Sequence, residues 1–229
     1  KNKIDICIDH HISNCLYATY SFIDQEAAAT AEVIYDLICE MKIDIDENIA
    51  SCIYTGISTD TGCFKYRNTR VKTHFIAAKM IECGANHAYI NKIMFDTHSK
   101  SHMILKGLVI NSMEIYFDGK CALISITNNL KEQAQKFCDQ CKIRDEDLEG
   151  LSSIPRSIEG VLVGVTMREN SDGNFKISLR TEKDINASDI CSKFSGGGHA
   201  AAAGCTISGP LENAKEKILS VIKQSLGEI

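Results

Sequence analysis

The strongest constraint on the fold is a change of pattern near residues 97–102, a polar segment in the middle of the chain. Before it, apolar residues recur mostly at the spacing typical of helices. After it, short apolar runs separated by turn residues predict strands, which alternate with a few helices. The sequence therefore predicts an α/β protein with two domains, over residues 1–98 and 112–229, joined by a linker over residues 99–111.

The predicted elements place polar residues at the ends of a strand and of a helix. A short apolar strand is predicted over residues 4–8, and Asp9 follows at its carboxyl end, where ligands gather in open α/β sheets. Asp24 is expected to cap a helix over residues 25–41, and Asp46 is expected to begin another. The remaining predictions are helices near 70–83, 86–95, 129–141, 186–194 and 211–226, a hairpin of 113–117 and 120–127, and strands near 158–168 and 174–181.

The composition narrows the classes of function. The chain has 229 residues, of which 44% are hydrophobic, and it has no apolar run of about 18 residues that would span a membrane. Its eleven cysteines are odd in number and scattered through apolar segments, which favours free thiols in a reducing cytoplasm. The net charge of −5 argues against a long duplex nucleic-acid partner and favours small phosphorylated substrates, because long tracks need clustered Lys and Arg.

The segment Asp9-His10-His11 supplies a carboxylate and two imidazoles in consecutive positions. In an extended backbone, Asp9 and His11 share one side and His10 points away. One imidazole can bind a divalent metal while the other donates to a phosphoryl oxygen. The alternative is a pair of solvated histidines at a strand end, and the tripeptide alone does not decide between them.

A second carboxylate lies in the segment Thr59-Asp60-Thr61-Gly62, which is predicted to be a tight turn after an apolar helix. The two threonine hydroxyls are expected to orient the Asp60 carboxylate, as hydrogen-bonding partners of metal ligands commonly do. Gly62 allows the backbone to turn sharply. The alternative is an Asp in an ordinary turn.

The segment Ser195-Gly196-Gly197-Gly198-His199 is predicted to be a loop with consecutive unhindered backbone N–H groups, which suit an anion. Three adjacent glycines cost considerable chain entropy on ordering, which argues against a filler role. Arg180, at the end of a predicted strand, is a candidate bidentate phosphate ligand nearby. A solvated charge at a strand end is the alternative for Arg180.

Taken together, these residues resemble the DHH phosphoesterase superfamily, named for Asp-His-His. The second half resembles its DHH-associated domain. The nearest group is that of the bacterial oligoribonucleases and 3′-phosphoadenosine 5′-phosphate phosphatases. The resemblance implies part of a parallel-sheet domain followed by a smaller α/β domain with a mixed sheet. It is carried by residues 9–11 with Asn14, by 56–62 with Phe64, by 147–150, Pro155, 160–161 and 178–180, and by the glycine loop.

The resemblance also implies roles for the candidate residues. His10 and Asp60 would bind Mn²⁺ in a two-metal centre, with Mg²⁺ or another divalent ion as alternatives. Asp9 would orient the pair and His11 would face the scissile phosphate, so both count as catalytic. The substrate, a short RNA or a nucleotide, would be held from the second domain by Arg180, Ser195, Gly196, Gly197, Gly198 and His199.

One departure from the family pattern is large. Members carry a His-x-x-x-Asp-x-Asp metal motif before the Asp-His-His strand and a further metal-binding Asp, and neither occurs here. The chain is therefore expected to be part of a longer enzyme, inactive by itself, or a degenerate relative. The alternative functions are cleavage of linear or cyclic dinucleotides and non-catalytic binding of nucleotide phosphates. A homodimer is left open.

Overall fold

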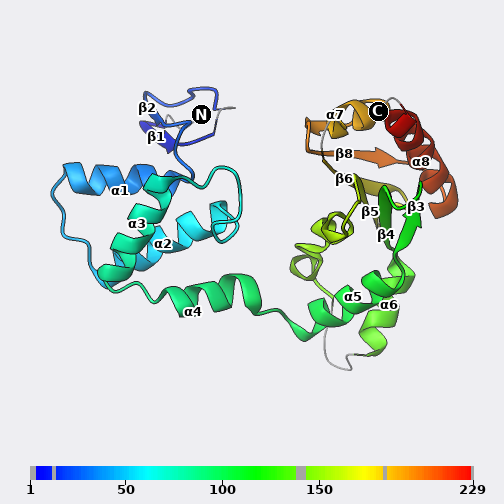
Figure 1. Cartoon of the computed structure of the whole chain (residues 1–229), viewed down its shortest axis with the longest axis horizontal. Coiled ribbons are helices and arrows are strands. Elements are labelled where there is room, and N and C mark those ends of the chain that lie inside the picture. Colours follow the sequence, from blue (N-terminus) through cyan, green and yellow to red (C-terminus); the bar gives the residue numbers. More distant parts are fainter. Residues whose placement is uncertain (1–3, 12–13, 138–142, 183–184, 228–229) are drawn as a thin grey trace. The chain divides into compact units, whose positions relative to one another are not determined.

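The computed structural model describes residues 4–11, 14–137, 143–182 and 185–227. It divides into two compact units, the first ending at Thr97 and the second beginning at His98 (Figure 1). None of the helices in these ranges has the length and apolar composition needed to cross a bilayer. The nine cysteines within the same ranges are free thiols, and the segment with Cys138 and Cys141 lies outside them.

The first unit is built from four helices and a small parallel sheet. Strands β1 and β2 pair in parallel with Ile6 opposite Tyr20, in keeping with the parallel sheet that was expected. A core of Ile53, Ile57, Ile76 and Met80 joins the helices. The elements are β1 (Ile6–Asp9), β2 (Tyr20–Ile23), α1 (Thr30–Glu40), α2 (Glu47–Asp60), α3 (Val71–Glu82) and α4 (His87–Asn91), followed by a π-helical turn (Lys92–Asp96).

Helix capping in the first unit agrees with the sequence at one position and differs at another. Asp46 accepts a hydrogen bond from the Ile49 amide at 2.8 Å and begins α2, as predicted. Asp24 does not cap a helix; its side chain accepts from the Glu26 amide at 3.0 Å. The helix starts only at Thr30, because the fully buried residues Ala28 and Ala29 precede it and Ala29 is extended.

The second unit is built around one mixed six-stranded sheet in the order β3-β4-β5-β6-β8-β7. The predicted hairpin around Asp118 and Gly119 joins β3 to β4, and both residues have positive φ. The elements are α5 (Lys100–Asn111), β3 (Glu114–Tyr116), β4 (Cys121–Ile126), α6 (Asn128–Lys136), β5 (Val163–Glu169), β6 (Phe175–Thr181), α7 (Ala187–Ser192), β7 (Gly197–His199), β8 (Ala202–Ile207) and α8 (Leu211–Gly227), with 3₁₀ turns at Asp145–Leu148, Leu151–Ser153 and Pro155–Ser157.

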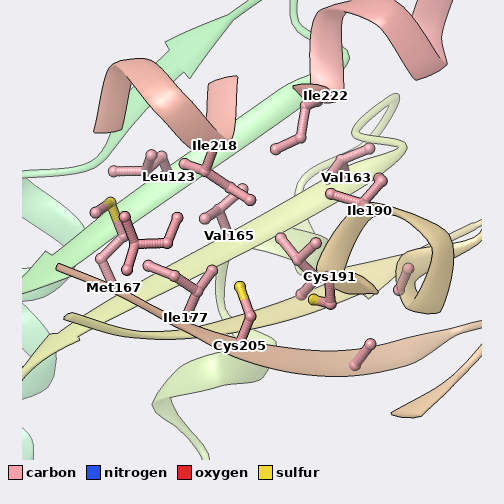
Figure 2. Close-up of a cluster of buried hydrophobic side chains, with 14 of the residues drawn as sticks. Leu123, Val163, Val165, Met167, Ile177, Ile190, Cys191, Cys205, Ile218 and Ile222 are labelled. Atoms are coloured by element: carbon pink, nitrogen blue, oxygen red, sulfur yellow. The ribbon is translucent and has the colours of Figure 1, made fainter. Parts of the chain in front are cut away.

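Two apolar cores cover the faces of this sheet. On one face, α7 and α8 pack over the strands, with Ile190 and Ile218 against Val165 and Ile177 (Figure 2). On the other face, α5 and α6 pack over β4 through Leu105 and Ala134. The 3₁₀ turns at Leu151–Ser153 and Pro155–Ser157 lie against β5 on that face, whereas Lys176 of β6 and Thr206 of β8 are exposed.

The structure differs from the sequence prediction at two places in this unit. Lys100–Asn111, within the expected linker, is helix α5, capped by Ser99 and packed through Leu105 and Val109. The glycine-rich segment is not an isolated loop, because Gly197–His199 forms edge strand β7 and the following alanines form β8. The C-terminal end of the helix expected near 129–141 reaches residues 138–142, which lie outside the described ranges.

Candidate functional site

The Asp9 carboxylate is surrounded by hydrogen-bond donors at the end of β1. Its Oδ1 accepts from the His10 amide at 2.7 Å and lies 2.6 Å from His11 Nδ1, while its Oδ2 accepts from Asn14 Nδ2 at 2.7 Å. The hydrogen bonds from Asn14 and His11 hold the pKa of Asp9 well below its usual range. Asp9 is therefore a carboxylate at neutral pH, and it orients the His11 ring.

Strand alternation predicted that the His10 ring points away from Asp9 and His11, and this prediction is wrong. One ligand atom from each of Asp9, His10 and His11 lies within 4.8 Å of the others, and the two imidazole centroids are 4.4 Å apart. The reason is that β1 ends at Asp9, so the alternation of a strand does not extend to the histidines. The three side chains form one cluster, which we call the acid–imidazole cluster.

His10 is oriented by the backbone and faces Asp60. Its Nδ1 lies 3.2 Å from the Ala27 carbonyl oxygen, which can only accept, so Nδ1 carries the proton. The neutral ring then has a lone pair on Nε2, which lies 3.6 Å from Asp60 Oδ2. Nearly fifty residues of chain separate these two side chains, and the fold places them face to face.

Asp60 is the last residue of α2 rather than part of a turn, and its carboxylate is 46% exposed. The flanking threonines do not orient it. Thr59 Oγ1 donates to the Thr55 carbonyl at 2.9 Å, and Thr61 Oγ1 donates to the Ile57 carbonyl at 2.6 Å. Threonines in a helix commonly donate to the preceding turn, and these hydroxyls bond to the backbone of α2 instead of supporting the carboxylate.

Asn68 connects the backbone around both side chains, a role that the sequence analysis missed. Its Nδ2 donates to the Ala28 carbonyl at 2.9 Å and to the Asp60 carbonyl at 3.2 Å. The neighbouring Ala27 carbonyl is the partner of His10. Nothing near Asn68 in the sequence distinguishes it from an ordinary polar residue after Gly62. Its contact with Ala28 spans forty residues, and such a contact leaves no spacing pattern in the sequence.

The donor set of the first unit fits a divalent cation. It contains an imidazole nitrogen with a fixed proton on the opposite nitrogen, which is the usual arrangement of histidine ligands. Two ligand atoms about 2.1 Å from one ion lie roughly 3–4 Å apart, and the 3.6 Å between His10 Nε2 and Asp60 Oδ2 falls in that range. Imidazole and carboxylate together suit Mn²⁺ or Mg²⁺ with further oxygen ligands.

In the second unit, the sheet register brings Arg180 and His199 onto one face. Arg180 of β6 is paired with Ala202 of β8, and His199 of β7 is paired with the same Ala202. Directly paired residues project to the same side of a sheet. The two cationic or protonatable side chains therefore flank one small alanine, on the face opposite to α7 and α8. Arg180 Nη1 donates to the Leu179 carbonyl at 3.0 Å, which keeps the guanidinium near its own strand.

The glycine segment offers fewer aligned N–H groups than a loop would. Gly197–His199 is extended and paired only with β8, so alternate rather than consecutive N–H groups face away from the sheet. Glycine is required at two of its positions by close approach. A Cβ on Gly196 would lie 2.3 Å from the Gly204 carbonyl oxygen, and one on Gly198 would lie 2.6 Å from the Ala202 carbonyl oxygen. Ser195 has a φ of +57°, which turns the chain into this strand.

Comparisons with known proteins match both parts of the chain. Residues 1–57 match the DHH family N-terminal domain, and residues 129–228 match the DHHA1 domain. The chain is 31% identical to a Thermus thermophilus protein named bifunctional oligoribonuclease and PAP phosphatase NrnA, over 96% of this chain and 64% of that protein. It is 27% identical to a Streptococcus mutans protein named probable bifunctional oligoribonuclease and PAP phosphatase NrnA, over 96% of this chain and 67% of the relative.

A solved structure shows the same fold along nearly the whole chain. It is the crystal structure of an exopolyphosphatase-related protein from Bacteroides fragilis, 32% identical with a TM-score of 0.83. The match covers 98% of this chain and 64% of that one. The chain thus spans slightly less than two thirds of both the Thermus relative and this structure. The chain thus carries a segment that matches the DHH family N-terminal domain, followed by a segment that matches the DHHA1 domain.

Proposed function

We propose that the chain is the larger part of a metal-dependent phosphoesterase that hydrolyses short oligoribonucleotides or nucleoside 3′,5′-bisphosphates. The observation that carries the proposal is the approach of His10 Nε2 to Asp60 Oδ2 at 3.6 Å, beside the Asp9–His11 pair. The names of the Thermus and Streptococcus relatives favour the substrate class. The free thiols agree with a reducing cytoplasm as the place of action.

In this proposal, each residue of the first unit has a distinct task. His10 and Asp60 hold Mn²⁺ or Mg²⁺, with Ala27 and Asn68 fixing the atoms they present. Asp9 keeps the proton of His11 on Nδ1, so that the exposed Nε2 exchanges a proton with a phosphoryl oxygen. The bound cation supplies positive charge opposite the phosphoryl oxygens and a Lewis acid for the attacking water.

The second unit binds the part of the substrate that does not react. Arg180 provides a permanent positive charge with planar donors, which match a phosphate. His199 adds a donor on the same face, and the outward N–H groups of Gly197–His199 add neutral donors. Neither group needs a metal to attract an anion, so this unit is expected to bind nucleotides in the presence of a chelator.

The proposal is tested by His10→Ala and Asp60→Asn in the full-length protein. We expect kcat for the release of mononucleotides from a trinucleotide RNA to fall by about 100-fold or more, since metal chemistry contributes several kcal/mol to such reactions. Mn²⁺ affinity, measured by electron paramagnetic resonance, should fall in the same variants. His87→Ala is the matched control, because this exposed histidine lies in the same unit outside the acid–imidazole cluster.

The same experiment separates the enzyme from its alternatives. Mn²⁺ binding that survives both substitutions would remove His10 and Asp60 from the metal site. Nucleotide binding without metal binding or turnover in the unmodified full-length protein would favour a non-catalytic binding module. Linear and cyclic dinucleotides are included as substrates, and a clear preference for either would redefine the substrate class.

A further inference from the structure

A cavity of about 590 Å³ lies beside the glycine segment in the second unit. It borders β8 and the strand that carries Arg180, β6. The residues that line it include Phe194, Lys176, Thr206 and Ser208. Neither the DHHA1 match nor the roles derived for Arg180 and His199 assign a task to it. Its volume lies within the range of small-molecule sites.

The cavity continues the face that presents Arg180. Along β6, the side chains of Lys176, Ser178 and Arg180 share the face away from α7 and α8, because the intervening residues are buried in that core. Ser178 is paired with Gly204, which is paired with Gly197 of β7. Lys176 is paired with Thr206 of β8, and Thr206 has no partner in β7, which begins opposite Gly204. The sheet is therefore one strand narrower beside Thr206, and the cavity lies there.

The positive charges at the two ends of this face are too far apart to share one phosphate. Lys176 and Arg180 are four residues apart on an extended strand, which separates their Cα atoms by about 13 Å. The hydrogen bond from Arg180 to the Leu179 carbonyl keeps the guanidinium at its own end. Lys176 is exposed, and no carboxylate within the described ranges pairs with it. A second phosphate further along a strand would therefore meet an unneutralised cation.

The other walls suit the rest of a nucleotide. Phe194, which is partly buried against the core beneath α7 and α8, lines the cavity and offers an aromatic ring for the face of a base, a contact that tolerates any base. Thr206 and Ser208 offer hydroxyls that donate to or accept from a ribose or a base edge. The two small residues Gly196 and Gly204 form the wall next to the glycine segment, and a side chain on Gly196 would not fit there.

We propose that this cavity, which we call the Lys176 pocket, binds an additional nucleotide of a single-stranded substrate whose terminal nucleotide is held near Arg180. The inference rests on the proposed function and narrows its substrate to oligonucleotides long enough to extend from Arg180 to Lys176. A nucleoside 3′,5′-bisphosphate fills only the Arg180 end. The pocket thus favours oligonucleotides of about three residues or more over the bisphosphate.

The test measures binding in the full-length protein with EDTA present, so that metal chemistry does not contribute. Adenosine 3′,5′-bisphosphate and 5′-phosphorylated oligoadenylates of two, three and four residues are titrated by calorimetry. The affinity should rise with length, and Lys176→Ala should weaken binding of the tetranucleotide by about fivefold or more, while the bisphosphate is unaffected. The slope of log affinity against log salt for the tetranucleotide should fall by about 0.7.

Two further variants make the result specific. Thr206→Glu places a carboxylate on an exposed wall of the pocket and should weaken the tetranucleotide at least as much. Lys217→Ala removes another exposed lysine, on α8 at the opposite face, and should change neither ligand. Thermal melting of each variant confirms that the fold is retained.

The outcomes distinguish the pocket from the proposed function. Bisphosphate binding that depends on Arg180, with no gain for longer oligonucleotides, would overturn the Lys176 pocket alone. Equal losses for the bisphosphate and the tetranucleotide in Lys176→Ala would show a general electrostatic effect and would also overturn it. No binding of any nucleotide by the unmodified protein would overturn both proposals.

Discussion

The strands of the two units are buried to different degrees. In the second unit, β6 alternates cleanly, with Phe175, Ile177 and Leu179 buried and the residues between them on the opposite face. In the first unit, the parallel strands β1 and β2 leave Tyr20 and Phe22 exposed, Phe22 by 63%. Parallel sheets normally have both faces covered, and an isolated two-stranded sheet is marginal in water.

This difference shows where each unit draws its stability. The second unit packs α7 and α8 over one face of its sheet, so the opposite face, which we propose binds phosphate, stands on a buried core. In the first unit, α2 and α3 pack through Ile57 and Met80, and the acid–imidazole cluster lies at the end of β1, where the strands of this chain are less buried. The residues proposed for chemistry therefore depend on a few specific contacts, whereas the residues proposed for binding depend on the core.

The largest expected effect tests this contrast with one substitution in each unit. Leu179→Ala should lower the free energy of unfolding of the second unit by about 3 kcal/mol, because it leaves a cavity in a fully buried core. In a protein of these 229 residues, Phe22→Ser in the first unit should change stability by less than about 0.5 kcal/mol. Hydrogen exchange with mass spectrometry assigns each change to its unit. If Phe22→Ser lowered the free energy of unfolding as much as Leu179→Ala, the exposed face of β1 and β2 would be covered in solution.

A buried carboxylate in the second unit gives the next largest effect. Asp147 is 2% exposed; it accepts from the Arg144 amide at 2.8 Å and from the Ser99 hydroxyl that caps α5. Asp147→Ala should cost about 2 kcal/mol of unfolding free energy, since hydrogen bonds to a charged acceptor are lost. Asp145→Ala, which removes a mostly exposed partner of Arg168, should cost well under 1 kcal/mol. Urea unfolding of both variants decides whether burial separates them.

In the first unit, a single amide is expected to matter for metal binding more than for stability. Asn68→Ala removes the hydrogen bonds to the Ala28 and Asp60 carbonyls and should weaken Mn²⁺ binding by about tenfold. Asn91→Ala is the control, because its amide donates to the Tyr54 hydroxyl instead. Titration followed by electron paramagnetic resonance provides the affinities. Unchanged affinity in Asn68→Ala with a lowered melting temperature would reduce Asn68 to a structural role.

The smallest effect concerns the protonation of Asp9. Because Asn14 and His11 hold the pKa of Asp9 below its usual value of 3.8, the carboxylate stabilises the fold above about pH 4. That contribution is lost as the pH falls through the lower pKa of the folded state. Asn14→Ala should raise the pKa of Asp9 toward 3.8, which a carbon-13 NMR titration of the carboxyl group measures. An unmoved titration curve would mean that His11 alone sets the pKa.

Local signals in the sequence were sufficient for elements with strong caps or turns. Asp46 before an apolar helical pattern predicted the start of α2, and Asp118-Gly119 predicted the hairpin of β3 and β4. These features depend on interactions within a few residues, so the sequence alone contains them. Asp9 and His11 also meet within a local segment, where His11 Nδ1 lies 2.6 Å from Asp9 Oδ1, although strand alternation did not account for the position of His10.

Tertiary pairing decided the elements whose residues have weak preferences of their own. The glycine and alanine residues of β7 and β8 have low strand propensity, and they become strands because β8 pairs with β6. The approach of His10 to Asp60 was likewise fixed by where α2 ends relative to β1, with Asn68 joining the two. The sequence by itself determined the kinds of chemical groups and their local orientation. Only the packing of distant segments decided which groups meet, because contacts across forty or more residues leave no periodic signal along the chain.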